Sequence, residues 1–114
     1  MRARLLPLFS VLISASFLTF PVLADEEALP SERQKQLIHL LKQDCGSCHG
    51  MTLKGGLGPA LLPENLEGKP TLFLKNTIIY GRPGTAMPPW KGLLTEQEAQ
   101  WLVTQIQQGI NNEK

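Results

Sequence analysis

CGSCH, residues 45–49, is the stretch that decides how this chain of 114 residues folds, because it holds both of its cysteines. Two cysteines three positions apart, followed at once by histidine, are the attachment signature of a c-type haem. The thiols of Cys45 and Cys48 can each add to one haem vinyl group, and the imidazole of His49 can then bind the iron as an axial ligand. The motif therefore predicts one covalently attached haem c.

Three other uses of the cysteine pair stay open on the sequence. A redox dithiol would follow a strand in a βαβ pattern, which the sequence does not show. A zinc site needs four ligands, and only His39 and His49 remain as candidates, with His49 crowded against Cys48. A disulfide between Cys45 and Cys48 would close a very short loop and add little stability. Haem attachment agrees best with the rest of the chain, and we interpret His39 as a surface residue.

The first 24 residues are typical of a cleaved secretory signal peptide. Arg2 and Arg4 form a basic start, an apolar stretch follows over residues 5–20, and a small-residue cleavage site ends at Ala24. An uncleaved anchor is the alternative, although the apolar run is shorter than the roughly 20 residues that a spanning helix needs. We therefore predict a periplasmic protein with a flexible N-terminus at 25–30, one domain at 31–109 and a C-terminal tail at 110–114.

Composition limits what the remaining chain can do. Cleavage after residue 24 leaves 90 residues, enough for one domain whose modest core a large apolar cofactor would help to stabilise. These residues include 9 Lys and Arg and 10 Asp and Glu, so the formal charge is −1. The lysines are scattered and form no basic stripe, which argues against nucleic-acid binding.

The pattern of apolar residues predicts helices on both sides of the motif. A first helix is expected over residues 31–44, opened by a capping box between Ser31 and Gln34 and running into the cysteines. Residues 50–58 contain four glycines and are expected to form a loop. A single helical turn is expected at 63–66.

Two further helices are expected in the second half. Pro70-Thr71 opens one that Gly81 ends, although the β-branched run at 77–79 leaves a short strand as the alternative. Thr95 and Glu98 form a capping box for the last helix, which Gly109 ends. The expected apolar faces are Leu72, Phe73, Leu74, Ile78 and Ile79 in the first of these helices, and Ala99, Leu102, Val103 and Ile106 in the second.

Met87 is the candidate for the sixth iron ligand. Met51 lies only two residues after His49 and is too close to reach the opposite face of a haem, whereas Met87 follows 38 residues later in a proline-rich loop. A thioether ligand favours reduced iron and raises the reduction potential. The alternative is a core or surface methionine, which is the commoner role. Pro88 and Pro89 would stiffen the ligand loop.

Three further residues are expected around the haem. A ligating histidine usually donates its second ring N–H to a carbonyl, and we predict that the Pro59 carbonyl accepts from His49. Trp90 can pack against the haem edge and donate its indole N–H to a propionate, and Arg82 can pair with a propionate. The alternatives are an ordinary loop proline, core packing for Trp90 and a solvated arginine at position 82.

With these residues in place, the chain resembles the class I cytochromes c. The resemblance covers nearly all 90 residues and rests on CGSCH (45–49), GPAL (58–61), GTAMPPW (84–90) and LTEQE (94–98). It implies an all-α fold of three to five helices around one covalently bound haem, with the first and last helices crossing. It also implies a monohaem electron carrier rather than an enzyme.

Two longer strings are similar to a narrower family within this class. DCGSCHG running into LKGGLGPAL (44–61) and GRPGTAMPPW (81–90) resemble the small periplasmic cytochromes c-55X, which denitrifying bacteria encode together with haem cd1 nitrite reductase. This resemblance implies single-electron delivery to cytochrome cd1 nitrite reductase. The alternatives are an accessory role in d1 haem maturation, and a haem enzyme or sensor whose sixth ligand is labile.

One position departs from the class pattern. Many class I cytochromes carry an aromatic residue ten positions after the cap of the last helix, where this chain has Gln105. Trp101 lies one turn earlier on roughly the same side. The contact between the first and last helices is therefore expected to be built differently, without consequence for the iron ligands.

Overall fold

The computed structural model describes residues 28–110. The expected signal peptide, residues 25–27 and residues 111–114 of the expected tail lie outside the described residues. Between residues 28 and 110 the chain forms helices and loops and no β-strand, so the predicted all-α class is confirmed. The elements are α1 (Ser31–Leu40), the π-helix η1 (Leu41–Cys45), α2 (Gly46–His49), α3 (Pro63–Leu66), α4 (Thr71–Tyr80) and α5 (Glu96–Gln108).

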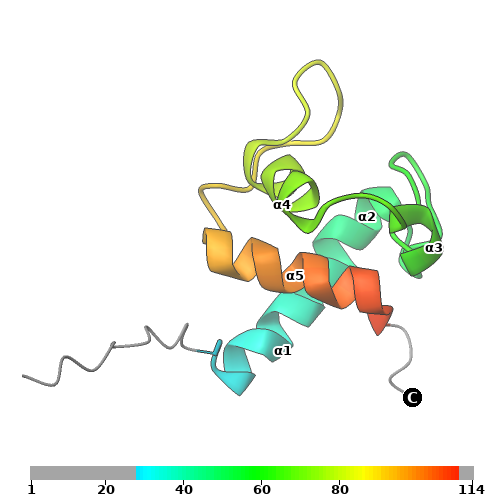
Figure 1. Cartoon of the computed structure of the whole chain (residues 1–114). Coiled ribbons are helices and arrows are strands. Elements are labelled where there is room, and N and C mark those ends of the chain that lie inside the picture. Colours follow the sequence, from blue (N-terminus) through cyan, green and yellow to red (C-terminus); the bar gives the residue numbers. More distant parts are fainter. Residues whose placement is uncertain (1–27, 111–114) are drawn as a thin grey trace, which may run out of the picture.

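The helix α5 is the centre of the fold. It packs against α4, α3 and α1, and the run from α1 to α2 passes across it (Figure 1). The first and last helices therefore cross, as the class resemblance implies. The short α3 lies beside the C-terminal part of α5, and α4 packs along the same helix (Figure 1).

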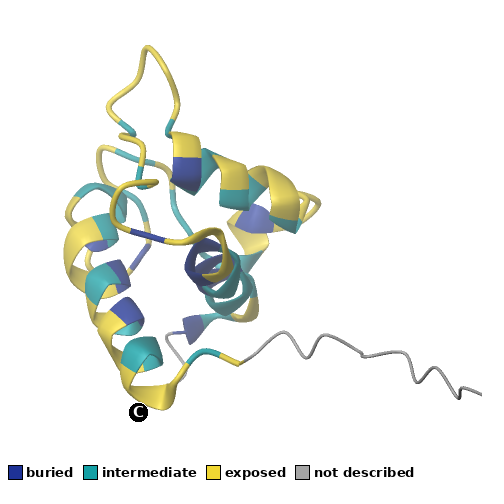
Figure 2. Cartoon of the chain, turned by 90° about the vertical axis from the view of Figure 1, so that its left-hand side faces the viewer, coloured by how far each residue is buried: buried dark blue, intermediate teal, exposed yellow. Residues whose placement is uncertain are grey.

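The core lies where α1 and η1 meet α5. Leu37 and Leu41 from the first helical run pack with Leu102 and Ile106 of α5. The four residues predicted to form the inner face of α5 are all buried, which follows from their helical spacing. Figure 2 shows the buried residues on the inward sides of the helices. The cluster is completed by Leu53, Leu66, Leu94 and Ile110.

The start of α1 differs from the prediction. Pro30 occupies the N-cap position, Ser31 is already helical, and no side chain caps the helix. The predicted Ser31–Gln34 capping box is therefore wrong. Gln34 instead donates its side-chain amide to the carbonyl of Leu29 at 2.8 Å, which ties the residues before the helix to its second turn.

The helix that enters the cysteine motif is not uniform. A single α-helix was expected over 31–44, but residues 41–45 form the π-turn η1, and α2 continues directly from it to His49. A π-turn replaces the usual i→i+4 hydrogen bonds by i→i+5 bonds, and such turns are common next to functional sites. Regular periodicity in the sequence carries no signal for such a local change.

The helix α4 confirms one expectation and corrects another. Residues 77–79 are helical, so the alternative of a short strand is wrong, and Gly81 ends the helix with a φ of +67°. Of the expected inner face, Ile79 is buried, and Leu74 and Ile78 pack partly against the core. Leu72 and Phe73 were assigned to that face but are exposed, so this part of the expectation is wrong.

Glu98 connects the start of α5 to α1. The predicted capping box is present: Glu98 N–H donates to the Thr95 hydroxyl at 3.1 Å, and Thr95 N–H donates to the Glu98 carboxylate at 2.8 Å. The second carboxylate oxygen accepts from Arg33 of α1. This hydrogen bond holds the pKa of Glu98 below the usual range for glutamate. One buried side chain thus caps α5 and fixes the helix crossing.

The structure shows what replaces the aromatic residue that is missing at position 105 of the last helix. Trp101 is half-buried and packs against the core cluster, whereas Gln105 takes no part in it. Gly109 ends the helix in the left-handed conformation, as predicted. Among the described residues, no helix is long and apolar enough to cross a membrane.

We predict that Glu98→Gln lowers the free energy of unfolding at pH 7 by about 1.5–3 kcal/mol, the usual range for hydrogen bonds to a charged group. Because the pKa of Glu98 is lowered in the folded state, its stabilisation is complete above the unfolded-state pKa of about 4.3. It is lost as the pH falls through the folded-state pKa. Guanidinium unfolding from about pH 7 to about pH 3 measures this dependence.

The difference between the wild-type and variant proteins should therefore shrink below about pH 4. The control is Glu32→Gln, which alters an exposed pair with Lys35 that contributes little to stability. A Glu98→Gln effect that stays constant over the whole pH range would contradict the ion pair with Arg33.

Candidate haem site

The cysteine motif lies at the end of the first helical run. Cys45 is the last residue of η1, and Cys48 and His49 belong to the single turn α2. Both thiols are free and half-buried. The hydroxyl of Ser47, between the cysteines, donates to the carbonyl of Asp44 at 2.7 Å and holds the turn together. The arrangement presents two thiols and an imidazole within one continuous helical segment.

The environment of Cys45 bears on the alternative uses of the pair. Burial, with the Asp44 carboxylate adding to it, raises the pKa of Cys45 to about 11, so this thiol is neutral at pH 7. Reactive redox dithiols have a lowered thiol pKa, which disfavours that use. Within residues 28–110, no three His, Cys, Asp or Glu side chains come together as metal ligands, and so the structure offers no zinc cluster there.

The imidazole of His49 is oriented by one backbone carbonyl. Its Nδ1 lies 2.6 Å from the carbonyl oxygen of Pro59, and this is the hydrogen bond that the sequence predicts. A carbonyl oxygen only accepts, so Nδ1 carries the hydrogen and donates. In the neutral ring the lone pair then lies on Nε2, which is the nitrogen available to a metal.

Gly58 lies directly against the same ring. A Cβ at this position would be 2.7 Å from both Cε1 and Nδ1 of His49, closer than carbon atoms approach one another. The imidazole is therefore held between a glycine backbone and a carbonyl, with no room for rotation toward either. The contact of Gly58 with the ring was not expected from the sequence, where its place directly before the predicted acceptor Pro59 was the available signal.

Loop 50–61 closes tightly onto the helix end. The N–H groups of Gly55 and Gly58 donate to the carbonyls of His49 and Cys48, each at 2.8 Å. Gly56 also approaches closely, since a Cβ there would lie 2.8 Å from the Cys48 carbonyl oxygen. Leu53, which is buried in the core, anchors the loop and accepts from the N–H of Leu61 at 2.9 Å.

Met87 lies on a second loop, which leaves α4 at Gly81 and projects beyond that helix (Figure 1). The base of the loop is closed by Arg82 N–H, which donates to the Met87 carbonyl at 3.1 Å. The Thr85 hydroxyl accepts from Met87 N–H at 3.3 Å and donates to the Arg82 carbonyl at 2.7 Å. A Cβ at Gly81 would meet the Met87 carbonyl oxygen at 2.8 Å. Met87 itself is half-buried.

The two remaining predicted residues lie at the ends of this loop. Arg82 is exposed, and among the described residues its guanidinium pairs with no carboxylate. Trp90 is half-buried, packs against the core cluster, and its backbone N–H donates to the Ile78 carbonyl at 3.0 Å. His39 is exposed, consistent with a surface role. Core packing for Trp90, one of the two alternatives, is thus present.

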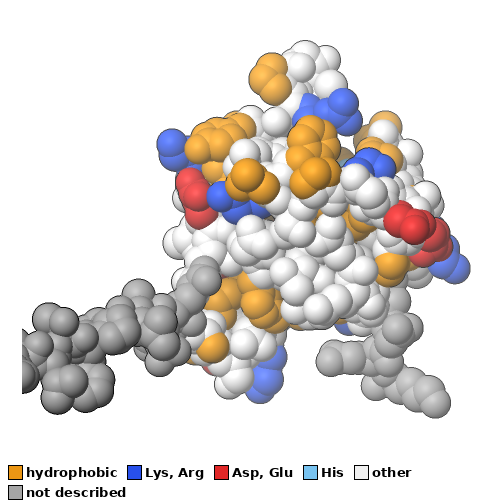
Figure 3. Space-filling model, viewed as in Figure 1, with side chains coloured by type: hydrophobic (Ala, Val, Ile, Leu, Met, Phe, Trp, Pro, Cys, Tyr) orange, Lys and Arg blue, Asp and Glu red, His pale blue; other side chains and the backbone are white. Residues whose placement is uncertain are grey.

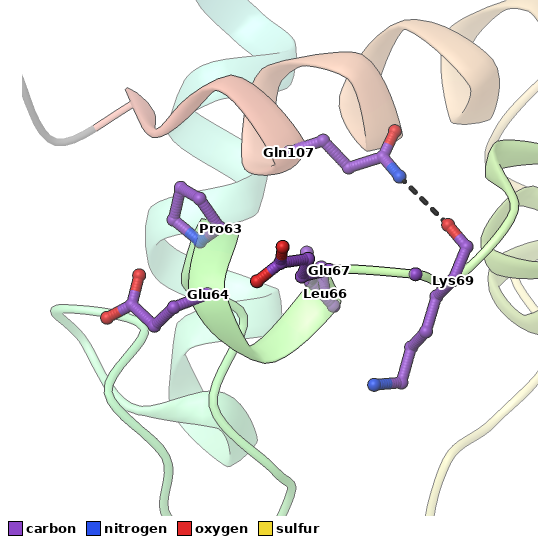
Figure 4. A pocket seen from close by; sticks show the side chains of 7 residues that line it. Pro63, Glu64, Leu66, Glu67, Lys69 and Gln107 are labelled. Carbon is purple, nitrogen blue, oxygen red and sulfur yellow. Dashed lines mark hydrogen bonds between the residues drawn. The ribbon is translucent and has the colours of Figure 1, made fainter.

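The structure brings together Cys45, Cys48, His49 and Pro59 and keeps Met87, Arg82 and Trp90 on a separate loop. Free thiols one turn apart and a histidine whose Nε2 lone pair is available fit a covalently held haem. A shallow pocket lies elsewhere, between α3 and the end of α5 (Figure 4). There Gln107 donates to the carbonyl of Lys69 at 3.2 Å, and none of the predicted haem residues lines it.

Comparisons with known proteins agree with this geometry. The family model described as cytochrome C oxidase, cbb3-type, subunit III matches residues 32–106. Cytochrome c55X of Pseudomonas aeruginosa is 60% identical over 89 residues, which cover 78% of this chain and 74% of the relative. The solved structure of the c-type cytochrome NirC aligns with a TM-score of 0.69 at 59% identity, over 70% of this chain and 94% of that one.

A larger protein contains a similar domain. The solved structure of dihydro-heme d1 dehydrogenase NirN in complex with DHE aligns with a TM-score of 0.60 and 36% identity. The match covers 68% of this chain but only 17% of the dehydrogenase. Helical fold, cysteine motif, matched family model and relatives of similar length all agree: the chain belongs to the c-type cytochromes, in the cytochrome c55X (NirC) family of electron carriers rather than enzymes.

Proposed function

We propose that the chain is a monohaem electron carrier whose haem c is attached through Cys45 and Cys48, with His49 and Met87 as axial iron ligands. When bound, the haem supplies an iron that gains and loses a single electron. The observation that carries the proposal is the hydrogen bond from His49 to Pro59, because it leaves Nε2 free to bind iron.

The protein's own residues hold the two ligands in place. Gly58 and the Pro59 carbonyl fix the plane of the His49 ring, and the hydrogen bonds among Arg82, Thr85 and Met87 restrain the second ligand loop. A restrained loop keeps a weak thioether ligand from being exchanged for water. Trp90 and the Arg82 side chain belong to the haem surroundings, and Arg82 supplies an unpaired cation for a propionate.

The partner that the family resemblance favours is periplasmic cytochrome cd1 nitrite reductase. The chain carries a typical signal peptide over residues 1–24, and its relatives of similar length are the cytochromes c55X. We infer that it works in the periplasm as a monomer and delivers single electrons to the reductase during denitrification.

A second candidate rests on the similarity to dihydro-heme d1 dehydrogenase. That dehydrogenase contains a domain related to this chain. The similarity supports the idea that this chain, as a separate protein, exchanges electrons with the dihydro-heme dehydrogenation reaction. In this role the chain would accept electrons during d1 haem maturation.

Rapid mixing separates these functions. The mature protein, purified from a host with haem-maturation machinery, is reduced and mixed with oxidised cytochrome cd1 nitrite reductase, and its oxidation is followed by absorbance. In the reverse experiment, the oxidised protein is mixed with the dehydrogenase and its dihydro-heme substrate. Fast oxidation of the cytochrome in the first mixture supports electron delivery to the reductase. Fast reduction of the cytochrome in the second mixture, without fast oxidation in the first, supports the maturation role. A product without haem would contradict both.

Met87→Ala should keep the covalent haem but lower the reduction potential. A fall on the order of 0.1–0.3 V is expected, within the roughly 0.8 V range that axial ligands span. Loss of the weak sulfur-to-iron absorbance band of the oxidised protein should accompany it. The matched control is Met51→Ala, which changes an exposed methionine near the motif. An unchanged potential in Met87→Ala would rule out Met87 as the ligand and favour an open sixth position.

Gly58→Ala should weaken the hold on His49. The added Cβ would overlap the imidazole, and the expected loss is about 1–3 kcal/mol in the free energy of unfolding. The change should also alter the Soret spectrum of the haem protein, because His49 would be held less firmly as an iron ligand. Gly92→Ala is the control, because no atom lies within 4 Å of a Cβ at that position. Equal effects in both variants would contradict the role of Gly58.

A further inference from the structure

The outer side of α4 carries aromatic side chains that the core does not use. Phe73 and Tyr80 are 56% and 52% exposed, and they lie seven residues apart, on the same side of the helix. The buried Ile79 is turned away from them by about 100° around the helix axis. Exposed aromatic side chains that gather on one face are typical of protein interaction sites.

These aromatics line a groove between α4 and the Met87 loop. Its helix wall consists of Phe73, Asn76, Thr77 and Tyr80, and its loop wall is formed by residues 81–83 and Thr85. The loop wall is restrained by the hydrogen bonds of Thr85 and Arg82. The groove is therefore continuous with the loop that carries the proposed iron ligand.

The chain segment that forms the groove walls carries only positive charges, one of which, Lys75, pairs with Glu96 of α5. From residue 68 to residue 95 the chain contains four Lys and Arg and no Asp or Glu. Arg82 lines the groove, and Lys91 lies over the ring of Tyr80 at 5.6 Å from its centroid. Neither cation forms an ion pair with a carboxylate of residues 28–110. Figure 3 shows hydrophobic and basic side chains interspersed over the upper part of this face, with acidic side chains toward its two sides.

We propose that this groove docks the redox partner, through a partner surface in which carboxylates surround an apolar side chain. The apolar side chain would fill the space between Phe73 and Tyr80, and the carboxylates would face the basic edge of the groove at Lys91. Small interfaces of this kind associate and separate quickly, and complementary charge speeds the encounter. The inference rests on the proposed electron-carrier function and names the surface through which it operates.

The test measures electron transfer from the reduced holoprotein to cytochrome cd1 nitrite reductase at about 10 mM and about 300 mM ionic strength. Lys91→Glu should slow the second-order rate about tenfold at low ionic strength, and the difference should largely vanish at high ionic strength. The double variant Phe73→Ser with Tyr80→Ser should slow the rate about tenfold under both conditions, because it removes apolar contacts.

The controls are Lys35→Glu and Leu57→Ser. Lys35 lies on α1 in the half of the molecule away from the Met87 loop, and Leu57 is 90% exposed on loop 50–61. Both controls should transfer electrons at the wild-type rate. Unchanged spectra and reduction potentials in all variants show that the haem site is intact.

The outcomes separate the docking surface from the function. If the wild-type protein reduces the reductase and the groove variants do so equally fast, the docking surface is wrong and the function stands. If Leu57→Ser slows transfer instead, docking uses the other loop. If the wild-type protein transfers no electrons to the reductase, both proposals fall. A wild-type dimer in sedimentation that the double variant dissociates would assign the groove to a second copy of the chain.

Discussion

The whole site depends on how closely loop 50–61 approaches the end of the first helical run. Two backbone hydrogen bonds return this loop to the carbonyls of Cys48 and His49. The closure places a glycine against one side of the His49 ring and a carbonyl oxygen at its Nδ1. The orientation and the tautomer of the imidazole are thus set by backbone atoms, which side-chain rotations do not disturb. Metal ligands are usually held in this way by partners that do not themselves touch the metal.

The loop that carries Met87 is closed in the same way. Gly81 ends α4 with a positive φ and leaves room for the Met87 carbonyl, as Gly58 leaves room for His49. Both loops begin at a helix end and return to it through backbone hydrogen bonds. They are carried by α2 and α4, whose positions depend on the packing around α5. The Arg33–Glu98 pair sets the crossing of α1 and α5, and so it contributes indirectly to the placement of loop 50–61 and the Met87 loop.

The sequence predicted those features that depend on local chemistry. The Thr95–Glu98 capping box, the ends of α4 and α5 and the bond from His49 to Pro59 each follow from residues close together in the chain or from an established ligand pattern. The errors have physical causes. Pro30 displaced the expected cap at Ser31, and Phe73 is exposed although it is apolar, because apolarity alone does not tell a core residue from an interaction surface.

Features that depend on distant parts of the chain were beyond sequence reasoning. Nothing local to Glu98 indicated that its second oxygen would accept from Arg33, 65 positions earlier. The approach of Gly58 to the His49 ring likewise depends on how the whole loop closes. The placement of Leu53 in the core, with a φ of +58° that non-glycine residues seldom adopt, follows from the same closure.

The π-turn η1 makes the direction of the cysteine motif independent of the side on which α1 packs against α5. A uniform α-helix would couple the two. In an ideal α-helix, Leu37, Leu41 and Cys48 would point to similar sides, so the residues that pack on α5 would dictate where the thiols face. A π-turn accommodates the equivalent of one additional residue, which rotates the following segment by about 100° relative to the preceding one. The core-facing side of α1 and the direction of the cysteine motif can therefore evolve separately. Related chains that lack this turn would align with a one-residue gap within 41–44.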